Sequence, residues 1–180
     1  LHFNEKLIRG SFTECINLNK SDIIFSTDAD EILYRKAYED LIPKLKNNTR
    51  KAFYLKLNNF LYSPNNFWIN SNFYAPSAMN AGFYRFNKIN QWRYEGVKIH
   101  YPYGIHFNWH LTPKEIVYKL NTYAHKNRYS KFADIELIQN SINNLKYPFD
   151  DREIEIKKVN HIENPELYPV CFDKHVEKFN

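Results

Sequence analysis

The sequence predicts a single α/β domain, and three local patterns carry that prediction. A continuous apolar run at residues 22–27 is typical of a strand that is buried on both faces. Residues 51–57 alternate between apolar and polar side chains, as a strand with one buried face does. Thr112, Pro113 and Glu115 form a helix start, with a capping hydroxyl, a proline at the first helical position and the acid of a capping box.

The first half of the chain combines these strands with helical segments. A helical period is present at residues 5–18 and again at residues 34–45, on either side of the first strand. Residues 58–76 are rich in asparagine, aromatic residues and proline, so we expect a long irregular segment there.

From residue 81 onward, three short strands and two helices are predicted. The helix that begins at the capping box should extend to about residue 125, and a further helix is expected at residues 132–145. From residue 147 the chain is polar and interrupted by prolines. Three short strands are expected, at residues 81–86, 97–100 and 105–107.

Composition and charge exclude several classes of protein. Hydrophobic residues make up 43% of the 180 residues and charged residues 25%, which is ordinary for a globular domain rather than a disordered chain. The net charge of +5 comes from scattered basic residues, so no nucleic-acid partner is expected. Cys15 and Cys171 belong to no zinc-binding pattern. No apolar run approaches the about 18 residues that cross a bilayer, so any membrane anchor would lie upstream of this chain.

An acidic motif follows the first predicted strand directly. In an extended chain, residues two apart point to the same side, so Asp28 and Asp30 can direct two carboxylates at one point. Ligands in open α/β sheets bind at the carboxyl ends of parallel strands, and oxygen ligands suit Mn²⁺ or Mg²⁺. Such a cation would neutralise a diphosphate as that group departs. Alternatively, the two aspartates form a turn or cap the next helix. For Glu31 we expect a structural role rather than a ligand role.

Four segments resemble one enzyme family in their order and spacing. Residues 21–32 read SDIIFSTDADEI, and residues 52–57 read AFYLKL before Phe-Leu-Tyr and a later tryptophan. Residues 104–109 read GIHFNW and run into TPKEI, and residues 123–125 read YAH. Together they resemble glycosyltransferase family 17, the family of β-1,4-mannosyl-glycoprotein 4-β-N-acetylglucosaminyltransferase, over most of the chain up to about residue 151.

This resemblance implies a GT-A-like fold related to the Rossmann fold, a UDP-sugar donor, a divalent metal and a glycan or glycoprotein acceptor. Asp28 and Asp30 would hold the metal and the donor diphosphate. His106 matches the histidine of the family's Gly-Trp-His segment and is expected to be a further metal ligand. Residues 1–151 would form the C-terminal part of the GT-A-like domain, and residues 152–180 an irregular extension.

Three departures from the family pattern affect these expectations. Leu33 stands where the family usually has proline, and Ile105 replaces the tryptophan of Gly-Trp-His. The strand-rich nucleotide-binding segment that precedes this region in the family is not in the chain, so we expect a fragment or a degenerate copy. The compartment stays open between a Golgi lumen and a bacterial cytoplasm.

The resemblance also implies an inverting reaction, which needs a general base for the acceptor hydroxyl. Asp134 and Glu136 begin the last predicted helix and are the candidates for catalysis, although favourable charge at a helix N-terminus explains them better. Lys119 is a candidate to screen the departing UDP, and a solvated helix face explains it equally well.

The aromatic residues after the second strand are candidates for sugar binding, because a flat apolar ring beside amide groups suits a sugar. The alternative is that about half of them form core under a loop. These residues are Phe60, Tyr62, Phe67, Trp68, Phe73 and Tyr74.

The leading hypothesis is transfer of N-acetylglucosamine, or a related sugar, from UDP to a glycan in a single displacement. One alternative is a catalytically inactive remnant that binds a glycan or a protein. The other is a haloacid-dehalogenase-type phosphatase, which also places Asp-x-Asp after a strand, although the later motifs of that class are not apparent here.

Overall fold

The computed structural model describes residues 16–47, 52–86, 96–122, 129–150, 152–170 and 172. The chain forms two compact units. The first unit comprises His2–Asn58 and Asn72–His106, and the second comprises Asn59–Ser71 and Phe107–Asn180. Two long strands, β3 (Ala52–Leu61) and β6 (Val97–Asn108), begin in the first unit and end in the second.

Several predictions fall outside the described residues. They concern the helix at residues 5–18 as far as residue 15, the two cysteines, and the segment at residues 123–125 with the end of the helix before it.

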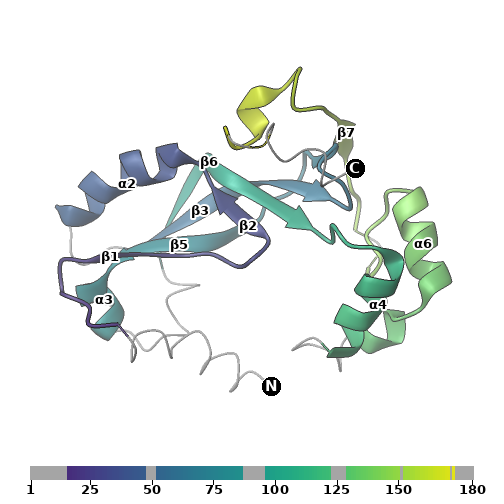
Figure 1. Ribbon diagram of the computed structural model, residues 1–180, viewed down its shortest axis with the longest axis horizontal. Coiled ribbons are helices and arrows are strands. Elements are labelled where there is room, and N and C mark those ends of the chain that lie inside the picture. Colours follow the sequence, from purple (N-terminus) through teal and green to yellow (C-terminus); the bar gives the residue numbers. More distant parts are fainter. Residues whose placement is uncertain are drawn as a thin grey trace. The chain divides into compact units, whose positions relative to one another are not determined.

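The first unit is built on an antiparallel sheet in which β5 lies between β1 and β3 (Figure 1). β1 (Ile23–Ser26) pairs with β5 (Tyr74–Asn80), with Ile24 opposite Met79, and β5 pairs with β3. The predicted mixture of helices and strands is confirmed. The expectation that β1 ends at the edge of a parallel sheet is wrong, since each strand pairing with a described register is antiparallel. The GT-A-like fold stays a prediction.

Both faces of this sheet carry apolar side chains, because successive residues of a strand point to opposite sides. On one face, α2 (Arg35–Lys46) covers the strands. The other face carries Ile24 and Met79 with the short helix α3 (Ala81–Phe86). β1 thus packs on both faces as predicted, with Ile24 buried and the other three residues partly exposed. The core under α2 consists of Ala37, Leu41, Leu45, Phe53, Leu55, Ala78 and Tyr103.

The short apolar segments are where the sequence-based predictions fail. Residues 81–86, predicted as a strand, form α3, because an apolar run of this length fits either structure. Asn80 accepts a hydrogen bond from the Gly82 N–H (2.8 Å), a contact typical of a helix start. Residues 97–100 and 105–107 belong to the single strand β6. The supposedly irregular segment at 58–76 contains β4 (Asn66–Trp68) and the beginning of β5.

The second unit combines the last strands of this sheet, seven-stranded in the described part of the chain, with a pair of helices. β4 pairs antiparallel with β7 (Ile156–Lys158) and, through Phe67, with Phe60 at the end of β3. The helices α4 (Pro113–Thr122) and α6 (Ile135–Asn143) lie side by side in Figure 1. The 3-10 helices η1 (Ser130–Phe132) and η2 (Pro165–Leu167) complete this unit. Its core contains Leu61, Tyr62, Ile116, Leu120, Ile138 and Phe149.

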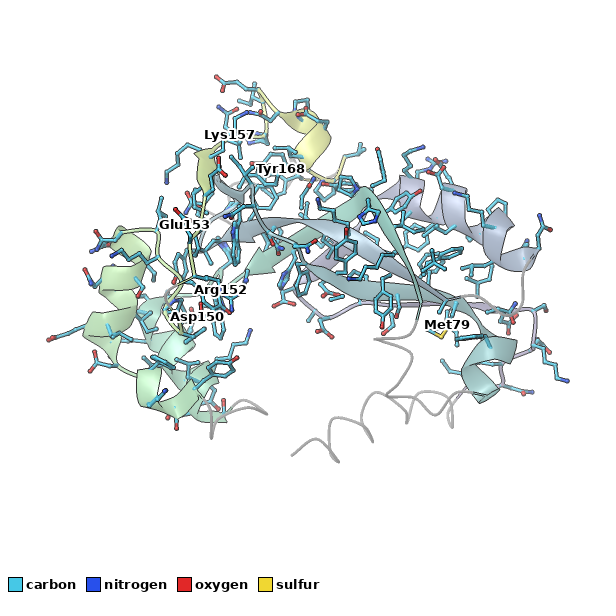
Figure 2. All side chains as sticks on the ribbon, turned by 180° about the vertical axis from the view of Figure 1, so that it is seen from behind. Met79, Asp150, Arg152, Glu153, Lys157 and Tyr168 are labelled. Carbon is cyan, nitrogen blue, oxygen red and sulfur yellow. The ribbon has the colours of Figure 1, made fainter. Side chains whose placement is uncertain are left out.

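The segment after residue 151 differs from the irregular extension that the sequence predicts. It contains β7 and the buried Tyr168 (Figure 2). The Tyr168 hydroxyl donates a hydrogen bond to the Pro64 carbonyl (2.8 Å), and its ring packs against Phe60 with 5.2 Å between centroids. At least part of this segment therefore belongs to the folded second unit.

The predicted helix start at residue 112 is confirmed. The Thr112 N–H donates to Glu115 Oε2 (2.8 Å), and the Glu115 N–H donates to Thr112 Oγ1 (3.4 Å), which is a reciprocal capping box. Within the described ranges, no helix has the length and apolar character needed to traverse a bilayer.

Candidate active site

The acidic motif lies in the connection between β1 and β2 (Glu31–Leu33). The Glu31 N–H donates to the Asp28 carbonyl (3.1 Å), and the Asp28 N–H donates to Glu31 Oε2 (2.8 Å). The turn that the sequence offers as an alternative is therefore present, and it is closed in both directions. These two bonds use the backbone of Asp28 rather than its carboxylate, so a turn and a binding role for the aspartates are compatible.

Strand β6 brings a histidine beside this turn. β2 and β6 pair antiparallel, with Glu31 opposite His106 and Leu33 opposite Gly104. A Cβ atom on residue 104 would lie 2.3 Å from the Ile32 carbonyl oxygen, a distance that no side chain tolerates. The glycine of the Gly-x-His segment is therefore required for the two backbones to approach, and that approach sets the position of His106.

Two of the predicted site residues in this unit, His106 and Asp30, lie close together. His106 Nε2 lies 3.7 Å from Asp30 Oδ2, which is longer than a hydrogen bond. The histidine side chain is 11% exposed, and that of Asp30 is 38% exposed. The Phe73 ring stacks on the imidazole with 4.4 Å between centroids. The pair thus has a buried imidazole held on one face and a carboxylate that solvent reaches.

The donor types at this pair fit a divalent cation. Carboxylate oxygen and imidazole nitrogen are both ligands that Mn²⁺ accepts, whereas Mg²⁺ prefers oxygen alone. Asp28 and Asp30 are partly exposed, so water or phosphate oxygens can reach them. Among the residues that the structure describes, no three acidic, histidine or cysteine side chains already gather in a metal-binding arrangement. The structure therefore brings Asp30 and His106 together and places Asp28 at the start of the same turn.

The residue that follows β2 takes part in polar contacts that the sequence did not suggest. Asn58 is buried on β3, and its amide donates to the Tyr34 hydroxyl (3.2 Å). The Tyr34 N–H donates to the Tyr103 carbonyl on β6 (2.8 Å). These bonds connect the residue that follows β2 to both β3 and β6, so they help to hold β2 in place.

The aromatic candidates for sugar binding divide as the core alternative predicts. Phe60, Tyr62 and Trp68 are buried in the second unit. Phe73 instead supports His106, a role that sequence reasoning missed. Its only signal in the sequence was its place among the aromatic residues before β5.

The remaining predicted residues lie in the second unit. Asp134 accepts a hydrogen bond from the Leu137 N–H (2.8 Å) and caps α6, and Glu136 is exposed in the first turn of that helix. The helix-start explanation therefore accounts for both. Lys119 Nζ lies 4.9 Å from the centroid of the Trp109 ring. The ammonium group of Lys119 thus already makes a cation–π contact.

One comparison with known proteins identifies a family. A family model described as glycosyltransferase family 17 matches residues 3–150, which include the acidic turn, Gly104 and His106. Searches among curated proteins and among solved structures found no significant match.

Proposed function

The chain belongs to glycosyltransferase family 17, and on this premise we propose that it transfers N-acetylglucosamine or a related sugar from a UDP-sugar to a glycan acceptor. The observation that supports this most directly is the acidic turn with His106 beside it. Asp30 and His106 lie 3.7 Å apart, and Asp28 begins the same turn. All three residues belong to one unit and to the matched region. The match also favours a transferase over the phosphatase alternative.

In this proposal, Asp28, Asp30 and His106 hold a divalent cation, with Mn²⁺ the better fit to a mixed oxygen and nitrogen donor set. When bound, the cation neutralises charge on the donor diphosphate. The partly exposed carboxylates supply the accessible side of the site, and Phe73 packs against one face of the imidazole. Lys119 is proposed to add positive charge for the departing UDP.

The chemical step is a single displacement. The acceptor hydroxyl oxygen forms a bond to the anomeric carbon, and the bond from that carbon to the UDP oxygen breaks with its electron pair going to UDP. The hydroxyl proton passes to a carboxylate, for which Asp134 and Glu136 are the proposed candidates. Glu136 is the better of the two, because the Asp134 carboxylate already caps α6.

The proposal is tested by Asp28→Asn and Asp30→Asn, each assayed for release of UDP from UDP-N-acetylglucosamine with Mn²⁺. Each substitution should lower the rate of UDP release by more than about 100-fold, because losing a metal ligand reduces activity more than losing a hydrogen-bond partner of a ligand does. Glu39→Gln is the matched control, since Glu39 lies in the same unit and pairs with Arg35 on the exposed side of α2 (2.7 Å). Full activity of both aspartate variants would refute the metal role.

The inactive-remnant alternative predicts a different result. Calorimetric titration of UDP and Mn²⁺ into the folded 180-residue chain separates the two. Binding supports a transferase site, whereas no binding to a chain that still unfolds cooperatively would favour a remnant that recognises glycans or proteins.

A further inference from the structure

Glu31 is the most buried of the three acidic residues in and beside the acidic turn. The residue is 6% exposed, whereas the side chain of Asp30 is 38% exposed. One of its carboxylate oxygens is already engaged by the Asp28 N–H at 2.8 Å. A buried carboxylate that accepts a backbone hydrogen bond forms a strong, charge-assisted contact. Glu31 therefore acts on the backbone of the turn.

We propose that Glu31 is a positioning residue that fixes the Asp28–Asp30 turn for cation binding and is not itself a ligand. This role rests on the proposed function, in which the turn binds a divalent cation. Two like charges at neighbouring positions repel each other. A turn closed by the Glu31 side chain and by the Glu31 backbone restrains both aspartates before a cation arrives, so less conformational entropy is lost on binding.

The strand register gives the same residue a second connection. Glu31 is the first residue of β2 and lies directly opposite His106 on β6. The closeness of these strands depends on Gly104, where a Cβ atom would collide with the Ile32 carbonyl. The turn is thus anchored at Glu31 to the strand that carries the histidine, so a displaced turn would also change the Asp30–His106 distance.

A ligand and a positioning residue respond differently to conservative substitution. Glu31→Gln keeps the shape and an oxygen that can accept the Asp28 N–H but removes the charge. Glu31→Ala removes the acceptor altogether. Asp28→Asn serves as the reference for loss of a proposed ligand. The two readouts are the Mn²⁺ affinity of the 180-residue chain, measured by calorimetry, and the hydrogen-exchange rate of the Asp28 amide, measured by NMR.

With Glu31→Gln, we expect the Mn²⁺ affinity to stay within about fivefold of wild type, because a neutral acceptor replaces a charged one. With Glu31→Ala, the affinity should fall about 10- to 100-fold, as for other supporting partners of metal ligands. The Asp28 amide should exchange faster in the alanine variant than in the glutamine variant.

Two results would overturn the proposal. A loss in Glu31→Gln as large as that in Asp28→Asn would make Glu31 a ligand through its charge, and this result decides the matter even if the alanine variant does not fold. Unchanged affinity and unchanged Asp28 exchange in a folded Glu31→Ala variant would show that the turn does not need the contact. Failure of the wild-type chain to bind Mn²⁺ would instead refute the proposed metal function, and Asp28 exchange would then decide the turn-holding role alone.

Discussion

At the scale of single residues, the candidate site depends on groups whose sequence signals differ in strength. The two aspartates stand out in the sequence because they follow an apolar strand, and the structure places them in a turn at the expected position. Gly104 and Phe73 carry weaker signals. The need for glycine arises only when β2 and β6 are paired, and the stacking of Phe73 on His106 joins residues far apart in sequence.

Gly104→Ala tests whether the approach of these strands holds the site together. The added methyl group would meet the Ile32 carbonyl at 2.3 Å, and this atom belongs to a paired backbone that cannot easily move. We expect the free energy of unfolding to fall by about 1–3 kcal/mol, as for other overpacked positions. Urea denaturation provides the measurement.

Gly82→Ala is the control for this prediction. A Cβ atom there would meet the side-chain oxygen of Asn80 at 2.9 Å, an atom at the end of a side chain rather than in a paired strand. Its destabilisation should be the smaller of the two. An equal or larger loss at Gly82 would contradict the explanation given for Gly104.

At the scale of elements, the sequence predicts best where a segment is long or carries its own boundary signal. The helix α2 and the helix start at Thr112 were predicted because their patterns are local. Residues 81–86 were assigned to a strand and form α3, since six residues are too few for the helical period to be distinguished. β4 and β7 are three residues each and are defined by pairing with distant partners, which no local pattern encodes.

The contact between α2 and β6 makes a pH-dependent prediction. The Tyr103 hydroxyl donates to Asp40 Oδ2 (2.9 Å), and Lys36 also approaches this carboxylate. These bonds, with that from Tyr103 the largest cause, hold the pKa of Asp40 below its ordinary value of 3.8. Burial and the bond to Asp40 raise the pKa of Tyr103 to about 12. A depressed carboxyl pKa stabilises the fold above pH 3.8, and this contribution is lost as the pH falls through the folded-state pKa.

Tyr103→Phe should therefore raise the pKa of Asp40 toward 3.8, with Lys36 still holding it partly down. It should also lower stability at neutral pH and flatten the loss of stability in acid. NMR titration of the Asp40 carboxyl group and urea denaturation between about pH 2 and 7 measure the two effects. Tyr101→Phe is the matched control, because Tyr101 is exposed on the same strand. An unchanged Asp40 pKa in Tyr103→Phe would contradict the prediction.

At the scale of the whole molecule, the family and the mixture of helices and strands followed from the sequence, whereas the division into two units did not. The family signal is a set of segments in a fixed order, which a linear sequence displays directly. The units are discontinuous, because residues 59–71 pack with residues 107–180 rather than with their neighbours. No composition change marks these boundaries, so the sequence predicted a single domain with an irregular end.

Tyr168→Ala tests whether the segment beyond the family match supports the second unit. The buried Tyr168 ring packs against Phe60, and its hydroxyl donates to Pro64. We expect a loss of about 3 kcal/mol in the free energy of unfolding, typical of deleting a buried aromatic ring. Tyr118→Ala removes the same side chain from an exposed position on α4 and should change stability by less than about 0.5 kcal/mol. Equal stability of the two variants would show that the segment is an independent appendage.

The pairing of β2 with β6 has a consequence for the order in which the site is assembled during synthesis. A ribosome releases Asp28 and Asp30 long before it reaches His106, and β6, the strand with which β2 pairs in the structure, also emerges later. During the early part of translation, the acidic turn therefore lacks β6, the strand that carries the imidazole of His106. The cation site proposed above would accordingly be assembled only after β6 has been made and has paired with β2.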